Sequence, residues 1–153
     1  MAKVIVVYES KHGNTKLVAD KIIEGMREVS GIETALSELK EVDLDRLTEY
    51  DAILVGSPNH WGRATRNTRV FIDELGNLNL KGKLATVFDT CFSSDFEKAV
   101  KKMEKQISEK VTGLKLVAPG LSIRVKGIKG PIIEGELPKC KEFGSKIASQ
   151  IKG

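Results

Sequence analysis

The feature that most constrains this chain is an almost unbroken β-branched run, residues 4–7, followed closely by a short polar turn and a helical pattern. A strand with one solvated face alternates apolar and polar residues, so the unbroken run predicts a strand buried on both faces of a parallel sheet. Apolar residues then recur at spacings of three and four across residues 16–29, which predicts an amphipathic helix. The unit is therefore a buried strand, a polar turn and a helix.

The polar turn reads Ser10-Lys11-His12-Gly13-Asn14-Thr15. The N-terminus of the following helix directs unpaired N–H groups and the positive end of its dipole at this turn, which suits a phosphate. The turn offers hydroxyl and amide side chains, one glycine and no acidic residue, and the motifs of nucleoside triphosphate and dinucleotide sites are missing from the sequence. The alternative is a well-capped helix start that binds nothing.

Further segments predict strands that alternate with helices. Residues 51–56 and 83–89 are apolar runs like the first, residues 32–39 alternate as an edge strand does, and residues 114–118 form a last short strand. Helical patterns occupy the intervening segments 43–50, 65–75 and 94–111, and a final one covers 138–151. This order predicts an α/β fold, a three-layer α/β/α sandwich with a five-stranded parallel sheet in the middle.

Two local predictions depend on shorter patterns. Ser94 and Glu97 have the spacing of a capping box, which predicts that they begin the helix, with Phe96 starting its apolar stripe. Residues 121–125 alternate and are followed by glycines, which predicts an exposed strand or hairpin.

Two further loops follow predicted strands. The second loop runs from Ser57 to Gly62 and contains Trp61, the only tryptophan, and the third runs from Asp89 to Ser94. Because the carboxyl ends of parallel strands share one edge of a sheet, we expect all three loops to meet where ligands bind in open α/β sheets. The indole of Trp61 either packs as an anchor or stacks on a bound ring.

Composition and charge narrow the class of protein. A length of 153 residues predicts one domain, 1–153, and the lack of a long apolar run or signal peptide predicts a cytoplasmic protein without membrane association. Cys91 and Cys140 fall outside metal-ligand spacings, so we expect free thiols and no metal. The net charge of +4 suits an acidic partner, but no nucleic-acid module accompanies it, so we expect no nucleic acid to bind.

The strand followed by Ser10-x-x-Gly13-Asn14-Thr15, together with the small residues and Trp61-Gly62 pair of the second loop, resembles the FMN-binding loops of flavodoxins. The similarity extends over nearly the whole chain in the order of its elements. It implies a flavodoxin-like fold with the flavodoxin strand order 2-1-3-4-5 and an insertion near residues 119–136 in the last strand region.

The resemblance also implies FMN as the cofactor and a set of residues that bind it, without a catalytic residue. Ser10, His12, Asn14 and Thr15 would hold the phosphate, and Trp61 would cover one face of the ring. The implied cofactor-binding residues are Ser10, Lys11, His12, Gly13, Asn14, Thr15, Ser57, Pro58, Asn59, His60, Trp61, Gly62, Asp89, Thr90, Cys91, Phe92 and Ser93.

Two features depart from the family pattern. Flavodoxins commonly have a stacking tyrosine in the third loop, where this sequence offers Phe92 or Phe96. Many flavodoxins also have acidic residues after the aromatic-glycine pair, whereas here Arg63 and Arg66 follow Gly62. A cation near the ring favours its reduced anion, which predicts a less negative second one-electron reduction potential.

Three functions remain open from the sequence. The leading interpretation is a flavodoxin-type carrier that moves electrons on non-covalent FMN between redox partner proteins, including acidic ferredoxin-like donors. The cations that would suit such partners are Arg63, Arg66, Arg124, Lys126 and Lys129. The second is an FMN-dependent NAD(P)H:quinone oxidoreductase of the flavodoxin-like group. The third is a flavin-free interaction domain whose first turn only caps its helix.

Overall fold

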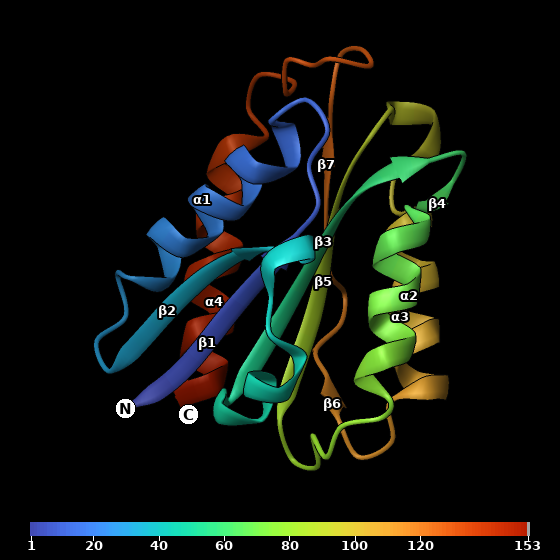
Figure 1. Cartoon of the computed structure of the whole chain (residues 1–153). Coiled ribbons are helices and arrows are strands. Elements are labelled where there is room, and N and C mark those ends of the chain that lie inside the picture. The colour runs from blue at the N-terminus through green and yellow to red at the C-terminus, as the bar shows by residue number, and fades with distance from the viewer. Residues whose placement is uncertain (153) are drawn as a thin grey trace.

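A mostly parallel sheet forms the middle layer of the computed structural model, which describes residues 1–152 (Figure 1). Its order is β2-β1-β3-β5-β6, and β7 pairs with the far end of β5. The parallel strands are β1 (Ala2–Tyr8), β2 (Ile32–Glu38), β3 (Ala52–His60), β5 (Leu84–Cys91), β6 (Lys115–Leu116) and β7 (Leu121–Arg124), and the short β4 (Arg63–Ala64) pairs antiparallel with β3. With β6 and β7 counted as two halves of one strand, the predicted order 2-1-3-4-5 is confirmed.

Helices cover both faces of the sheet, which completes the predicted three-layer sandwich. Figure 1 shows α1 (Asn14–Met26) and α4 (Leu137–Lys152) on one side, and α2 (Arg66–Leu75) and α3 (Lys98–Lys110) on the other. Short 3-10 helices span Leu39–Glu41, Leu44–Glu49 and Ser93–Asp95. No helix within residues 1–152 has the length and apolar character needed to cross a membrane.

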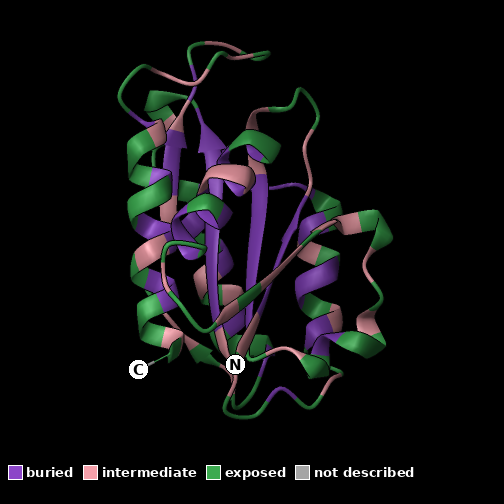
Figure 2. Ribbon diagram, turned by 90° about the vertical axis from the view of Figure 1, so that its left-hand side faces the viewer, coloured by how far each residue is buried: buried purple, intermediate pink, exposed green. Residues whose placement is uncertain are grey.

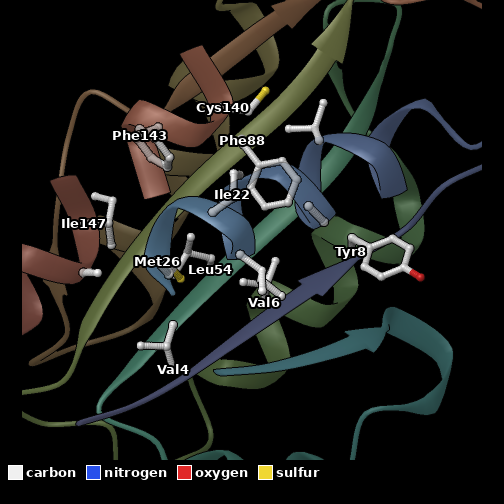
Figure 3. Close-up of a cluster of buried hydrophobic side chains, with 14 of the residues drawn as sticks. Val4, Val6, Tyr8, Ile22, Met26, Leu54, Phe88, Cys140, Phe143 and Ile147 are labelled. Carbon is white, nitrogen blue, oxygen red and sulfur yellow. The ribbon is translucent and has the colours of Figure 1, made fainter. Parts of the chain in front are cut away.

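The β-branched run of β1 is buried on both faces, as its sequence predicts. Val4 and Val6 pack into the cluster under α1 and α4, together with Phe88 of β5 (Figure 3). Ile5 and Val7 point the other way, into the cluster under α2 and α3. Figure 2 shows the same division, with the central strands almost wholly buried and each helix buried along its inner side. This burial on both faces fixes the position of the turn that follows β1.

Helices α1 and α4 pack closely because each places a glycine at their contact. A Cβ added to Gly25 would collide with the carbonyl oxygen of Lys141, and one added to Gly144 would collide with that of Ile22. Neither position has room for a side chain. This close packing holds the start of α1 near the segment that leads into α4.

The prediction for residues 121–125 is confirmed for the strand and wrong for its exposure. The segment forms β7, which runs parallel to β5 with Ile123 opposite Thr90, and the Ile123 side chain is fully buried. The alternation of apolar and polar residues predicts a strand with one exposed face, but both Ser122 and Ile123 are buried between the sheet and its helices. Only Val125 and Ile132 form an antiparallel bridge, at the base of a loop in the insertion.

The predicted capping box at α3 is also wrong. Residues 93–95 form a separate turn, and Glu97 adopts a left-handed conformation with φ of 66° and makes no side-chain cap. Side chains of two strands, β7 and β5, bind the start of α3 instead. Glu97 N–H donates to Ser122 Oγ at 2.9 Å and Val100 N–H donates to Asp89 Oδ2 at 3.2 Å. Phe96 is 43% exposed and so does not belong to the core stripe.

Candidate functional site

The three polar loops meet at the carboxyl edge of the sheet, near the top of Figure 1, and enclose a pocket of about 130 Å³ that opens to solvent. The ends of β3 and β5 and the turn after β1 line it on one side, and the segment after β7 lines it on the other. The lining residues are Ser10, Lys11, His12, Asn14, Thr15, Pro58, Asn59, His60, Thr90, Cys91, Phe92, Val125, Gly127 and Ile128.

The first turn presents hydrogen-bond donors to this pocket. Gly13 precedes α1 with φ of 88°, a conformation that favours glycine. Ser10 Oγ accepts from Gly13 N–H at 3.1 Å and from Lys16 N–H at 3.3 Å. Within residues 1–152, no acceptor is bound to the backbone N–H groups of His12, Asn14 or Thr15. Three donors at the positive end of a helix are therefore available to an anion.

Buried hydroxyl groups fix the floor of the pocket. Thr15 Oγ1 and Thr90 Oγ1 are 2.9 Å apart and both residues are buried, so this hydrogen bond joins the start of α1 to the end of β5. Ser57 is fully buried in β3, where its Oγ donates to the Pro58 carbonyl and accepts from Thr65 N–H. These contacts hold the three strand ends in fixed register beneath the loops.

The second loop is a hairpin and not an irregular loop, because β3 continues to His60 and β4 folds back on it. Asn59 shapes the turn: its Oδ1 accepts from Gly62 N–H at 2.8 Å, and its Nδ2 donates to the Asp95 carbonyl at 3.3 Å. Trp61 at the tip has φ of 57° and is 97% exposed. The hairpin therefore presents the indole to solvent beside the pocket.

Exposed apolar side chains surround the pocket. Besides Trp61, Phe92 is 42% exposed, Phe96 is 43% exposed and Ile128 is 75% exposed. Such a gathering of large apolar groups at one edge marks a binding surface. Together with the free donors of the first turn, this rim fits a ligand with a phosphate at one end and a flat ring at the other, which is the chemistry of FMN.

Six of the predicted cofactor-binding residues do not line the pocket. Ser57 and Asp89 are buried beneath it, and Gly13 and Gly62 shape the turns. Trp61 and Ser93 are exposed outside it, Trp61 at the tip of the hairpin. The other eleven are brought together, as expected for loops at one sheet edge.

Asp89 has a structural role that the sequence did not predict. Its side chain is fully buried, and Ser122 Oγ donates to Asp89 Oδ1 at 2.6 Å. Burial raises the pKa of the Asp89 carboxyl to about 7, and the hydrogen bonds from Ser122 and Val100 oppose that rise only in part. The carboxyl holds β5, β7 and α3 together under the third loop.

Two further titratable groups that line the pocket, His60 and Cys91, have shifted pKa values. Burial, with the nearby charge of Lys11, lowers the pKa of His60, so its imidazole is neutral at pH 7. Burial raises the pKa of the Cys91 thiol to about 11, which keeps it protonated. Both cysteines are free, as predicted, and residues 1–152 hold no cluster of three His, Cys, Asp or Glu side chains suited to a metal ion.

The segment after β7 contributes pocket-lining residues that the sequence did not predict. Val125, Gly127 and Ile128 line the pocket, and a Cβ at Gly130 would lie 2.6 Å from Asn14 Oδ1, so the insertion packs on the first turn. The sequence signal for this contact was Ile128, a large apolar residue between Gly127 and Gly130. In the same region Arg124 Nε lies 2.7 Å from Glu136 Oε1, so Arg124 is not a free cation.

Comparison with known proteins identifies the family. A flavodoxin domain model matches residues 5–125, which is most of the chain. The chain belongs to the flavodoxin family. It is 29% identical to a flavodoxin of Clostridium saccharobutylicum over 98% of both proteins.

Solved flavodoxin structures agree with this assignment. A flavodoxin from the domain Archaea superposes with a TM-score of 0.84 at 30% identity and covers 99% of both chains. Oxidised Flavodoxin 2 from Bacillus cereus superposes with a TM-score of 0.81 at 32% identity and covers 99% of this chain and 100% of its own. The chain is a flavodoxin-type electron carrier, and the quinone reductase alternative is not favoured.

Proposed function

We propose that the pocket at the carboxyl edge binds FMN non-covalently and that the chain exchanges electrons with protein partners through it. One observation carries the proposal: a turn with three free N–H donors and the exposed side chains of Phe92 and Ile128 line the same pocket, with Trp61 exposed beside it. A phosphate would satisfy the donors, and a flat ring system would bury the apolar rim.

The residues divide between the two ends of the ligand. Ser10, His12, Asn14 and Thr15 would hold the phosphate, because they form the turn at the start of α1. Trp61 and Phe92 would cover the ring from the hairpin and from the third loop. FMN supplies the capacity to carry electrons when bound, and the chain orients the ring and excludes water from it. Ile128 would add an apolar contact from the insertion.

A comparison of FMN with riboflavin tests both ends of the pocket. FMN added to the flavin-free chain should lose its fluorescence as Trp61 stacks on it, and the loaded protein should be yellow. Riboflavin lacks the phosphate and should bind at least about tenfold more weakly, because charge-assisted hydrogen bonds contribute about 1.5 to 3 kcal/mol each. Equal affinity for the two flavins, or no binding of FMN, would contradict the proposal.

A second measurement tests whether NADPH reduces the bound flavin directly. The loaded protein, mixed with NADPH without oxygen, should keep its colour, because a carrier receives electrons from proteins. Rapid bleaching would contradict the carrier function and favour a reductase.

A further inference from the structure

We propose that the tip of the β3–β4 hairpin and the start of α3 form a docking surface for an acidic redox protein. This surface, the hairpin surface below, consists of Trp61, Arg63, Lys98 and Lys102. The inference rests on the proposed function, because it places an electron-transfer partner beside the pocket for the flavin.

The fold brings the four side chains together from two elements. A Cβ added to Gly62 would lie 3.6 Å from Lys98 Cδ and 3.7 Å from Lys102 Nζ, so both lysines of α3 lie against the hairpin turn. Arg63 follows Gly62 and pairs with His60 across the hairpin, with its side chain exposed. Trp61, which precedes Gly62 in the same turn, is 97% exposed. An exposed indole and three cations thus gather at one turn.

The positive charge of this surface is not fully neutralised. Lys98 Nζ lies 3.3 Å from Asp95 Oδ1, and Lys101 Nζ lies 3.8 Å from Glu97 Oε1. In the described part of the chain, Arg63 and Lys102 have no carboxylate within 4.0 Å. These two cations would therefore attract an acidic surface during the encounter.

One of the cations that the sequence assigned to docking, Arg124, is not free to bind a partner in the structure. Arg124 is bound by Glu136, whose carboxylate is buried. Burial raises the pKa of Glu136, but its hydrogen bonds from Arg124 and Lys139 outweigh that effect and leave the pKa lowered, so the pair stays ionised. Lys98 and Lys102 of α3, by contrast, are not among the cations that the sequence assigned to docking.

A redox protein suits this surface better than a nucleic acid. One exposed indole with a few cations forms a small patch, and small, polar-rimmed interfaces are typical of transient electron-transfer complexes. Single-stranded nucleic acid is bound by several stacking aromatics along a basic groove. The hairpin surface offers a single aromatic tip.

Charge reversal at the two unpaired cations tests the proposal. The variant is Arg63→Glu with Lys102→Glu, and the matched control is Lys81→Glu with Lys146→Glu, two exposed lysines away from the hairpin that give the same change in net charge. The probe is an acidic plant-type [2Fe–2S] ferredoxin without tryptophan. Because Trp61 is the only tryptophan of the chain, its emission reports docking even in the flavin-free protein.

Two readouts separate docking from flavin binding. In the flavin-free chain, ferredoxin should shift the Trp61 emission for the native protein and the control, and the affinity of the hairpin variant should fall at least about tenfold. In the FMN-loaded chain, the rate of electron transfer from reduced ferredoxin should fall similarly at low salt, and its salt dependence should flatten. FMN affinity, measured separately, should stay within about twofold for both variants, because all four substituted side chains lie outside the pocket lining.

Several results would overturn the inference. They are an unchanged emission titration for the hairpin variant, an equal loss for the control, or tighter binding of a single-stranded oligonucleotide than of ferredoxin. Failure of the native chain to bind FMN would refute the proposed function alone, since the emission titration needs no flavin and still decides the docking.

Discussion

The floor and the rim of the pocket are built in opposite ways. The floor consists of buried polar side chains, Thr15, Ser57, Thr90 and Asp89, each held by hydrogen bonds. The rim consists of apolar side chains that remain exposed, with Trp61 as the extreme case. Buried polar groups are costly unless they are paired, whereas exposed apolar groups gain free energy only when something covers them.

This difference separates stability from binding. Substitutions in the floor should change the free energy of unfolding of the flavin-free chain, because the floor contacts exist without ligand. Substitutions in the rim should leave that free energy nearly unchanged and alter flavin affinity or electron transfer. The predictions below test this division, beginning with the largest expected effect.

Replacement of Asp89 by asparagine should change how stability depends on pH. The folded-state pKa is raised from 3.8 to about 7, so the folded chain binds the proton more tightly than the unfolded chain. This stabilisation is complete below about pH 4 and is lost as the pH rises through 7. The unfolding free energy of Asp89→Asn relative to the native chain should therefore rise by roughly 4 kcal/mol between about pH 4 and pH 8.

Urea unfolding of both proteins across this range measures the effect. Asn keeps one oxygen as an acceptor for Val100 N–H, and its NH2 group can donate to Ser122 Oγ, so the shape and both contacts are conserved with one hydrogen bond reversed. A constant difference at every pH would show that Asp89 does not titrate in the folded state. Glu97, the N-cap residue of α3, is a carboxylate whose charge adds only a minor effect to the pKa of Asp89, so Glu97→Gln serves as the control with a small expected effect.

Replacement of Trp61 by alanine should weaken FMN binding by about 2 to 3 kcal/mol, or roughly thirty- to two-hundredfold, because a large aromatic contact is lost. The flavin-free chain should unfold at nearly the same urea concentration, since the indole is 97% exposed. Trp61→Phe should recover part of the affinity. Loss of stability in the flavin-free Trp61→Ala variant would break the distinction between floor and rim.

Replacement of Thr15 by valine tests the floor through one hydrogen bond. Valine keeps the shape but leaves the Thr90 hydroxyl without its partner, which should cost about 1 to 2 kcal/mol of unfolding free energy. Thr15→Ser keeps the hydroxyl and should retain most of the unfolding free energy. In a double-mutant cycle with Thr90→Val, the two losses should be less than additive. Full additivity would mean that the two hydroxyls do not interact.

The sequence predicted the fold well because its main signals are local and repeated. The unbroken apolar run of β1 and the helical spacing of α1 required only short stretches, and the order of elements allowed few arrangements of the sheet. The predictions failed where tertiary contacts override local patterns. The start of α3 is capped by Asp89 and Ser122, which lie 11 and 25 residues in sequence from the N–H groups that they bind, so no local pattern could reveal this.

The candidate site was predicted in part for the same reason. The three loops could be placed at one edge from the strand pattern, which brought residues such as Asn14, Asn59 and Thr90 together. The insertion could not be placed, because its contact with the pocket depends on the path of residues 125–130 after β7. Likewise Asp89 reads as part of a loop in the sequence, but it ends up under the pocket because β5 continues to Cys91.

Replacement of Arg63 by glutamate should have the smallest effect on the flavin itself, which it reaches only through the electrostatics beside the pocket. Arg63 is exposed in β4, next to the hairpin turn, so solvent screens its charge. Reversal of this charge should lower the second one-electron reduction potential by tens of millivolts, where about 59 mV corresponds to a tenfold change in the equilibrium constant. Lys146→Glu, with the same change in net charge on α4, should shift it less. An anaerobic reductive titration measures both potentials, and equal shifts in the two variants would mean that net charge, and not the position of Arg63 on the rim, sets the potential.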